Sequence, residues 1–298
     1  MATSSVRLNL ADFGTLTSKL RDYYTLTKPE VNLLILMTTS AGYYLASRGP
    51  LKVVGMLSTL VGTLLVASGT ATLNQWTERV WDGQMRRTAK RPLPSGRVSS
   101  REALIFGVLL SIAGGAYLWL AVNSLSALLA ISTLLSYLFV YTPLKRKTPL
   151  CTMIGAFPGA MPTLIGWAGA GAAINRQALL LFGVLFLWQF PHFLAIALMY
   201  RDDYSRAGYH MLPEFDRDSR FTRGEILVFT LALIVITMLP PTGAGALYFV
   251  GMIASGVFLL YYVLKLMNST SKAGPSRLLH ASVLYLPVVL ALMMVYRH

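Results

Sequence analysis

Residues 74–82 read Asn-Gln-Trp-Thr-Glu-Arg-Val-Trp-Asp and place three oxygen-bearing side chains, Asn74, Glu78 and Asp82, at intervals of four residues. In an α-helix, steps of four advance about 400° around the axis, so these side chains would share one face. Oxygen ligands along one edge suit a hard cation such as Mg²⁺. The segment therefore predicts a helix that ends in a candidate cation site.

A basic run follows this segment directly. Arg86, Arg87, Lys90 and Arg91 lie within a few positions of one another. Arginine can donate two parallel hydrogen bonds to phosphate oxygens, so the run would suit an anion held by the cation. A second interpretation is that some of these cations only anchor the chain to anionic lipid. Together the two segments predict metal and phosphate chemistry at a membrane edge.

The composition is that of a polytopic membrane protein. The chain has 298 residues, of which 55% are hydrophobic and 13% charged, and its mean hydropathy is +0.57. We expect an all-α bundle, because helices satisfy the backbone polar groups inside a bilayer. The expected transmembrane segments are nine, at about 31–47, 53–76, 103–121, 124–142, 150–171, 178–200, 225–241, 244–265 and 279–296.

The distribution of positive charge predicts the orientation in the membrane. A net charge of +14 would suggest a nucleic-acid partner in a soluble protein, but here 22 of the 26 Lys and Arg residues lie before the first segment or in alternate connections. The positive-inside rule then places the N-terminus in the cytoplasm and the C-terminus outside. We expect a multi-pass protein of a bacterial inner membrane, with its active site facing the cytoplasm, the lipid bilayer as its surroundings and no nucleic-acid partner.

The spacing of the connections predicts the domain organisation. Residues 1–30 would form a cytoplasmic segment, and residues 31–298 a single transmembrane domain. Within it, a four-helix pattern at about 53–142 returns at about 178–265, each time with carboxylates where a long inside loop begins. Such a duplication would let two carboxylate clusters face each other across one cavity.

The second cluster contains Asp202 and Asp203. Adjacent aspartates repel, so keeping both ionised at a membrane boundary favours a metal or an arginine partner. Alone, the pair would more often be a solvated helix end; beside the first cluster it is a candidate second Mg²⁺ site. Tyr141, Lys145 and Arg146 end another segment on the same side and could close the anion pocket.

These motifs resemble those of the UbiA superfamily of intramembrane prenyltransferases, and within it the branch that farnesylates haem. The resemblance runs from Leu-Thr-Lys-Pro-Glu-Val at 26–31 to the last helices. It includes the 74–94 region, Trp-Gln-Phe-Pro-His-Phe at 188–193, and the stretch from Tyr200 to Pro213. The second cluster departs from the usual Asp-x-x-x-Asp spacing. Tyr209 and His210 replace the usual small residue and proline.

The resemblance implies a UbiA-type bundle around a central cavity, and transfer of a farnesyl group from farnesyl diphosphate to a vinyl group of haem B with water added. Mg²⁺ would be the cofactor, with haem B as a substrate. Haem A synthase or terminal-oxidase assembly factors are candidate partners. The implied catalytic residues and metal ligands are Asn74, Glu78, Asp82, Asp202 and Asp203. The implied substrate-binding residues are Arg86, Arg87, Lys90, Arg91, Tyr141, Lys145, Arg146, His192, Tyr200 and Tyr204.

Several alternatives remain open at this point. His192 follows Pro191 and is either a haem contact, such as an axial ligand, or a buried histidine bonded to a neighbouring helix. The chain could prenylate an aromatic quinone precursor in place of haem. Acidic residues near interrupted helices also occur in ion-coupled transporters. Clustering of the carboxylates beside arginines at one membrane face favours phosphate chemistry over transport.

Overall fold

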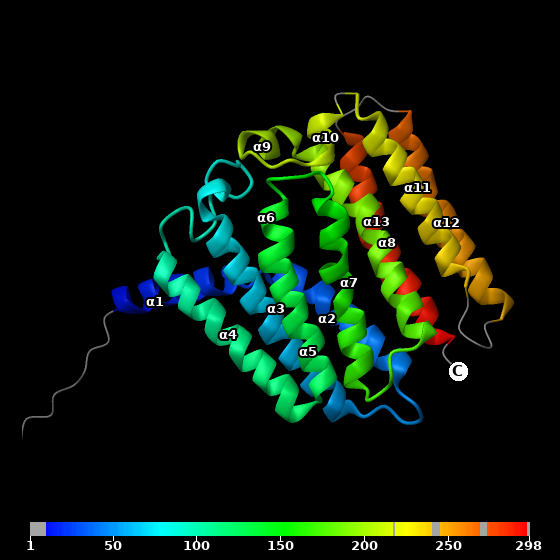
Figure 1. Ribbon diagram of the computed structural model, residues 1–298, viewed down its shortest axis with the longest axis horizontal. Coiled ribbons are helices and arrows are strands. Elements are labelled where there is room, and N and C mark those ends of the chain that lie inside the picture. The colour runs from blue at the N-terminus through cyan, green and yellow to red at the C-terminus, as the bar shows by residue number, and fades with distance from the viewer. Residues whose placement is uncertain (1–9, 217, 240–244, 269–272, 297–298) are drawn as a thin grey trace, which may run out of the picture.

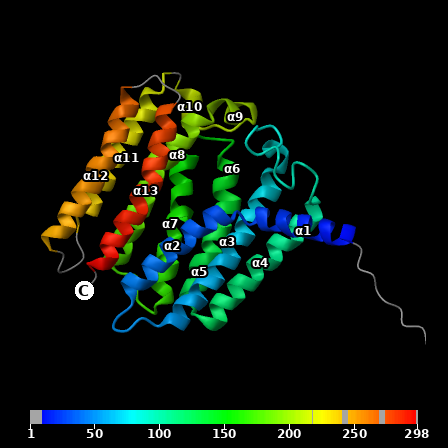
Figure 2. The same ribbon diagram turned by 180° about the vertical axis from the view of Figure 1, so that it is seen from behind.

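The computed structural model of the chain is a bundle of long helices with short helices across one end (Figures 1 and 2). The structure describes residues 10–216, 218–239, 245–268 and 273–296. The elements are α1 (Leu10–Leu26), α2 (Pro29–Ala46), α3 (Val53–Asp82), α4 (Ser100–Ala121), α5 (Ser124–Leu135), the π-helical η1 (Ser136–Tyr141), α6 (Thr142–Leu144), α7 (Cys151–Gly169), α8 (Arg176–Met199), α9 (Arg201–Arg206), α10 (Leu212–Phe215), α11 (Arg220–Thr237), α12 (Ala246–Met267) and α13 (Ala273–Val295).

The expected all-α architecture is confirmed. Each expected apolar segment falls on a long helix of the described part, with α5, η1 and α6 acting as one. Six of these segments are long and apolar enough to cross a membrane, namely α3, α4, α5 to α6, α8, α12 and α13. Crossing by α2, α7 and α11, and hence the count of nine, stays a prediction. Some of the expected positions lie outside the described residues. They are positions 240, 241 and 244 of the expected segments and, among the counted Lys and Arg residues, Arg7, Arg217, Lys272 and Arg297.

Close helix packing explains the small residues of α2 and α7. A Cβ on Gly42 would lie 2.2 Å from the Thr163 carbonyl oxygen, and one on Gly166 would lie 2.0 Å from that of Thr39. Only glycine permits this approach of two backbones, which is a common device between membrane helices. The prolines inside α7, Pro158 and Pro162, are buried, as expected for helix irregularities within a bilayer.

Helix α8 forms much of the core and packs on α7, α11 and α13. Trp188 is 3% exposed, and its indole Nε1 donates to the Ser282 carbonyl oxygen of α13 at 2.8 Å. Outward-facing apolar side chains are exposed elsewhere in the bundle, for example Ile112 and Leu120 on α4 and Val250 on α12. An apolar outer surface of this kind fits contact with lipid tails.

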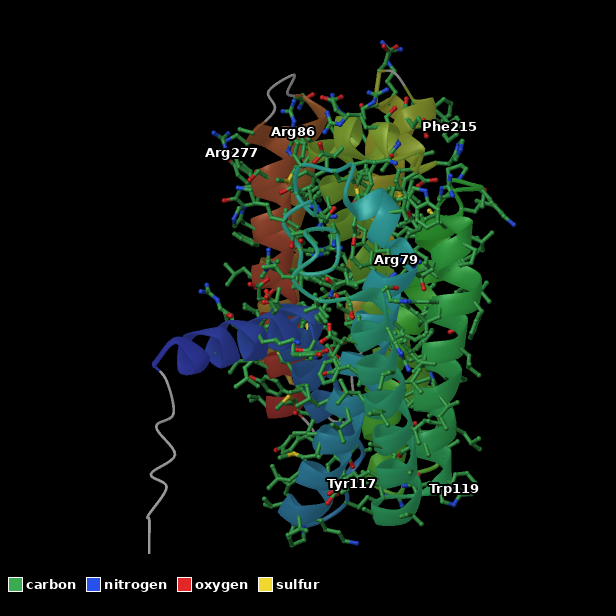
Figure 3. The ribbon with its side chains drawn as sticks, turned by 90° about the vertical axis from the view of Figure 1, so that its left-hand side faces the viewer. Arg79, Arg86, Tyr117, Trp119, Phe215 and Arg277 are labelled. Atoms are coloured by element: carbon green, nitrogen blue, oxygen red, sulfur yellow. The ribbon has the colours of Figure 1, made fainter. Side chains whose placement is uncertain are left out.

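The polar connections gather at one end of the bundle. Figure 3 shows Arg86, Phe215 and Arg277 at this end and Tyr117 and Trp119 at the other. In Figures 1 and 2 the connection from α3 to α4 lies beside α9. The loops that carry the predicted cations and carboxylates therefore share one end of the molecule.

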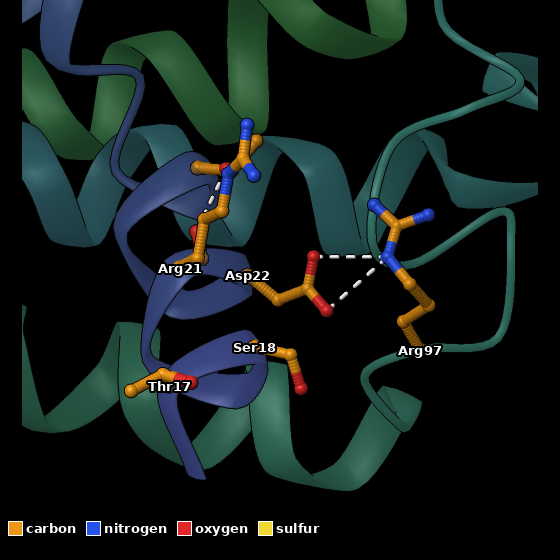
Figure 4. Close-up of a pocket in the computed structure, with 6 residues that line it drawn as sticks. Thr17, Ser18, Arg21, Asp22 and Arg97 are labelled. Carbon is orange, nitrogen blue, oxygen red and sulfur yellow. Dashed lines mark hydrogen bonds and ion pairs between the residues drawn. The ribbon is translucent and has the colours of Figure 1, made fainter. Parts of the chain in front are cut away.

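Helix α1 lies across the long helices and is tied to this end. Its Lys19 pairs with Glu102 of α4 at 2.7 Å, and Asp22 pairs with Arg97 of the 83–99 loop at 2.9 Å. A cavity of about 620 Å³ lies beside the second pair, lined by Thr17, Ser18, Arg21, Asp22, Thr25 and Arg97 (Figure 4). No residue of the predicted site lines this cavity.

Candidate functional site

The last turns of α3 bury all three predicted oxygen-bearing side chains. Asn74, Glu78 and Asp82 are 1%, 5% and 1% exposed, respectively. Asn74 Nδ2 donates to Glu78 Oε2 at 2.9 Å, which places the first two on one helix face, as the four-residue spacing predicts. Their burial is costly for charged groups unless each finds a partner.

Lys145 is the partner of Glu78. Its Nζ lies 2.9 Å from Glu78 Oε1 and also stands over the Tyr141 ring, 4.5 Å from the centroid. Burial alone lowers the pKa of Lys145, but Glu78 and the nearby tyrosines outweigh it and raise the pKa well above its ordinary value. Lys145 therefore stays charged in the free protein.

The π-helical turn η1 stands directly before α6 and carries the tyrosines around Lys145. Tyr137 and Tyr141 make an edge-to-face contact with centroids 5.0 Å apart, and Thr142 donates back to the Tyr137 carbonyl oxygen. Single π-helical turns inside α-helices are frequent at functional sites. On the other side, a Cβ at Gly155 of α7 would lie 2.5 Å from the Tyr141 ring, so glycine makes room for that ring.

Two further cations reach the same helix face. Arg91 Nη1 lies 2.7 Å from Asp82 Oδ2, and Lys28 Nζ donates to Asn74 Oδ1 at 2.9 Å. Lys28 stands between α1 and α2 with φ 52°. Burial, followed by repulsion from Arg91, lowers the pKa of Lys28 to about 7. An added anion would favour the charged form of Lys28 and raise its pKa again.

The second predicted cluster divides between the surface and the interior. Asp202 is exposed, whereas Asp203 is 8% exposed and pairs with Arg206. The segment after α9 contacts the loop after α3, because Ala207 and Tyr209 pack against Met85. Of the adjacent aspartates, only Asp203 is turned into the protein.

The other predicted cations and tyrosines line the same end more loosely. Arg86, Arg87, Lys90 and Arg146 are exposed. The Arg87 guanidinium stands over the Tyr200 ring at 5.2 Å, and that of Arg146 over Trp81 at 4.3 Å. These stacked guanidinium groups keep donor edges available at the surface.

His192 lies apart from the carboxylates. Its Nδ1 is 3.0 Å from Ser282 Oγ of α13, and its ring stacks on Trp188 with centroids 4.6 Å apart. This is the contact expected of a histidine bonded to a neighbouring helix. The structure does not bring His192 together with Glu78 or Asp82, and a haem contact stays a prediction.

Sequence reasoning missed four residues of this cluster: Lys28, Tyr137, Thr142 and Tyr209. Lys28 belongs to the Leu-Thr-Lys-Pro stretch, which contributed to the family resemblance but was not predicted to be part of the site. Tyr137 stands four residues before Tyr141, the spacing of one helix face. Thr142 and Tyr209 carried no local signal of a site.

The residue types fit a hard divalent cation. The buried atoms of the cluster that could bind a metal are carboxylate and amide oxygens, the ligands that Mg²⁺ prefers. Glu78, Asp82 and Asp203 each hold one cationic partner, so each carboxylate is already placed for a positive charge. Among the described residues, no three His, Cys, Asp or Glu side chains come together closely enough to hold one ion. A metal would therefore replace Lys145 or Arg91 as the partner of its carboxylate.

Comparison with known proteins places the chain in a family. Residues 35–287 match the UbiA prenyltransferase family. A Solibacter usitatus protein named protoheme IX farnesyltransferase is 47% identical over 93% of this chain and 99% of its own length. A digeranylgeranylglyceryl phosphate synthase structure has a TM-score of 0.77 at 18% identity, covering 94% of this chain and 99% of that one.

A structure of a UbiA homolog from Archaeoglobus fulgidus, bound to GPP and Mg²⁺, has a TM-score of 0.65 at 16% identity, covering 91% of this chain and 99% of that one. These two structures show the fold alone. The family match spans most of the sequence, and the Solibacter relative extends the likeness to nearly the full length. The chain is an integral membrane protein that belongs to the UbiA prenyltransferase family.

Proposed function

We propose that this chain transfers the farnesyl group of farnesyl diphosphate to a vinyl group of haem B, with addition of water, and gives haem O and diphosphate. One observation carries the proposal: 47% identity extends over 99% of a relative named protoheme IX farnesyltransferase. The α3 cluster supports it, because buried carboxylates beside Lys145 and Arg91 suit a metal and a diphosphate.

In the proposed reaction, the bond between farnesyl C1 and the diphosphate oxygen breaks, and its electron pair leaves with the diphosphate. The vinyl π-bond of haem B forms the new carbon–carbon bond to C1. Water adds to the resulting cation and loses a proton. Because negative charge grows on the departing diphosphate, catalysis requires fixed positive charge around it.

The residues would divide this task as follows. Asn74, Glu78 and Asp82 would hold one Mg²⁺, and Asp203 with Asp202 a second. Bound Mg²⁺ supplies positive charge that stabilises the leaving diphosphate. The exposed members of the basic loop, Arg86, Arg87 and Lys90, and Arg146 beside Trp81 would meet the diphosphate as it enters.

Lys145 and Arg91 have a double role in this proposal. In the free protein they neutralise Glu78 and Asp82 at 2.9 and 2.7 Å. With their carboxylates engaged by a metal, Lys145 and Arg91 would be available for diphosphate oxygens, where charge-assisted hydrogen bonds are strong. This exchange of partners would keep every buried charge compensated in both states.

We place the reaction at the cytoplasmic face of a bacterial inner membrane. The shared end of the polar connections supports this placement, together with the excess of Lys and Arg in them. Residues 1–30 would be a cytoplasmic segment and 31–298 one transmembrane domain with a duplicated four-helix pattern. Haem A synthase or terminal-oxidase assembly factors would exchange haem with it.

An assay that compares three acceptor substrates tests the proposal. Purified protein in detergent is given farnesyl diphosphate, Mg²⁺ and either haem B, hydroxybenzoate or dihydroxynaphthoate, and products are identified by mass. We expect a product from haem B only, and none after chelation of Mg²⁺. A prenylated aromatic acid without a haem product would assign the chain to another substrate. Mg²⁺-independent solute flux in liposomes without any product would favour a transporter.

A further inference from the structure

The backbone of Tyr209 is fixed on both sides. Gly208 adopts φ +66°, in the left-handed region that favours glycine, and lets the chain reverse after α9. Tyr209 N then donates to the Tyr204 carbonyl oxygen at 3.0 Å, and His210 N donates to that of Lys145 at 2.8 Å. Tyr209 is therefore held to α9 and to the residue that pairs with Glu78.

The side chain of Tyr209 is buried between two loops. It is 2% exposed and packs with Met85 of the loop after α3 and with Ala207. Its ring meets that of Tyr204 edge to face, with centroids 5.9 Å apart. Packing on several sides leaves the ring one position, so the hydroxyl has a defined direction.

The hydroxyl of Tyr209 makes no hydrogen bond of normal geometry within the part of the chain that the structure describes, although the Glu78 carboxylate lies close enough to interact with it. Burial, and next the charge of Glu78, raise the pKa of Tyr209 above its ordinary value; Lys145 and Asp82 also act on it. A tyrosine hydroxyl is protonated at neutral pH and can donate one hydrogen bond. A buried donor without an acceptor is unfavourable, and a phenylalanine would fill the same space without that penalty.

This hydroxyl stands among the groups to which the proposed function assigns the metal and the diphosphate. Its electrostatic neighbours are Glu78 and Asp82, which would be metal ligands, and Lys145, which would turn to the diphosphate. Glu78 already accepts from Asn74 and pairs with Lys145, so a diphosphate oxygen would offer this hydroxyl an acceptor that is still free. We propose that Tyr209 Oη donates a hydrogen bond to an oxygen of the substrate's diphosphate, so that Tyr209 is a substrate-binding residue; this rests on the proposed function.

The test compares full-length wild type with Tyr209→Phe. Binding of inorganic diphosphate in the presence of Mg²⁺ is measured by calorimetry in detergent, and the Tm of the free protein is recorded. We expect the Kd of Tyr209→Phe to rise about tenfold or more, as for loss of a hydrogen bond to a charged group. We expect its Tm to stay the same or rise, because the free protein loses no hydrogen bond of normal geometry.

Tyr285 provides a matched control. Its hydroxyl likewise makes no hydrogen bond of normal geometry among the described residues, and the residue is 1% exposed on α13, in the apolar core. Tyr285→Phe should leave the diphosphate Kd unchanged. Replacing Tyr209 with 4-aminophenylalanine, which restores a donor at the ring end, should recover binding.

The outcomes separate this proposal from the proposed function. Equal diphosphate binding by wild type and Tyr209→Phe would overturn the role of Tyr209 and leave the proposed function intact. A Tm loss in Tyr209→Phe well beyond that of Tyr285→Phe would mean a partner within the free protein and would also overturn it. Wild type that neither binds diphosphate nor farnesylates haem B would overturn both.

Discussion

Lys145 Nζ and Glu78 Oε1 form an ion pair of 2.9 Å between side chains that are 11% and 7% exposed. The pair joins α3 to the end of α6, across 67 positions of sequence. Removing one member of a buried pair leaves an uncompensated charge, which typically costs about 3 to 5 kcal/mol. Lys145 is therefore paired with the carboxylate that a metal ion would need. We expect Lys145 and the metal ion to compete for Glu78.

The first prediction concerns this competition. Lys145→Met should lower the Tm of the metal-free protein, because Glu78 is left without a partner. Mg²⁺ should then raise the Tm of the variant more than that of wild type, since binding to the folded state stabilises it by mass action. Diphosphate affinity should fall roughly tenfold, the effect of one charge-assisted hydrogen bond.

Lys147→Met is the control for that experiment. Lys147 is exposed in the same basic run, so its loss should change neither the Tm nor the Mg²⁺ response. If Mg²⁺ raises the Tm of Lys145→Met and of wild type equally, Glu78 is not a metal ligand.

The second prediction separates the adjacent aspartates. Asp203 is buried beside Arg206, whereas Asp202 is exposed. Asp203→Asn should reduce kcat/KM at least tenfold more than Asp202→Asn, because a solvated carboxylate can be replaced by water as a ligand. Steady-state kinetics at saturating Mg²⁺ measure the difference. Equal losses in the two variants would contradict the assignment of Asp203 as the inward-facing ligand.

The third prediction uses the contact between Gly155 and Tyr141. A methyl group at position 155 would lie 2.5 Å from the ring, so Gly155→Ala should displace Tyr141 and with it Lys145. We expect lower diphosphate affinity in a protein that still folds. Gly224→Ala in α11, where nothing lies within 4 Å of the added carbon, should be neutral or stabilising by about 0.5 to 1 kcal/mol. Unchanged diphosphate binding by Gly155→Ala would show that Tyr141 does not position the cation.

The fourth prediction concerns His192 and its bond to Ser282. His192→Leu removes the ring nitrogens and should raise the KM for haem B while leaving diphosphate binding unchanged. Ser282→Ala keeps the ring and should reduce only the stability, by about 1 kcal/mol of lost hydrogen bonding, which is measured as a lower Tm. If both variants lose only stability, His192 serves packing and the haem contact is wrong.

Local sequence patterns predict much of the fold and part of the site. The helices follow from runs of apolar residues, and the Asn74 to Glu78 contact follows from four-residue spacing, because both are properties of one segment. Partners from other segments could not be derived this way. Lys28 reaches Asn74 from 46 positions away, and Tyr209 reaches the cluster only after Gly208 reverses the chain. The π-helical turn at 136–141 likewise has no sequence pattern that distinguishes it from an ordinary helix.

The most direct test of the central claim is the mass of the haem product formed in ¹⁸O-labelled water by wild type and by Asp82→Asn. Both proteins are supplied with farnesyl diphosphate, haem B and Mg²⁺, and the folding of each is verified by its Tm. We predict that wild type gives a haem heavier by one farnesyl group and one labelled water, and that Asp82→Asn gives none. Full activity of Asp82→Asn, or wild type that leaves haem B unchanged, would contradict the account.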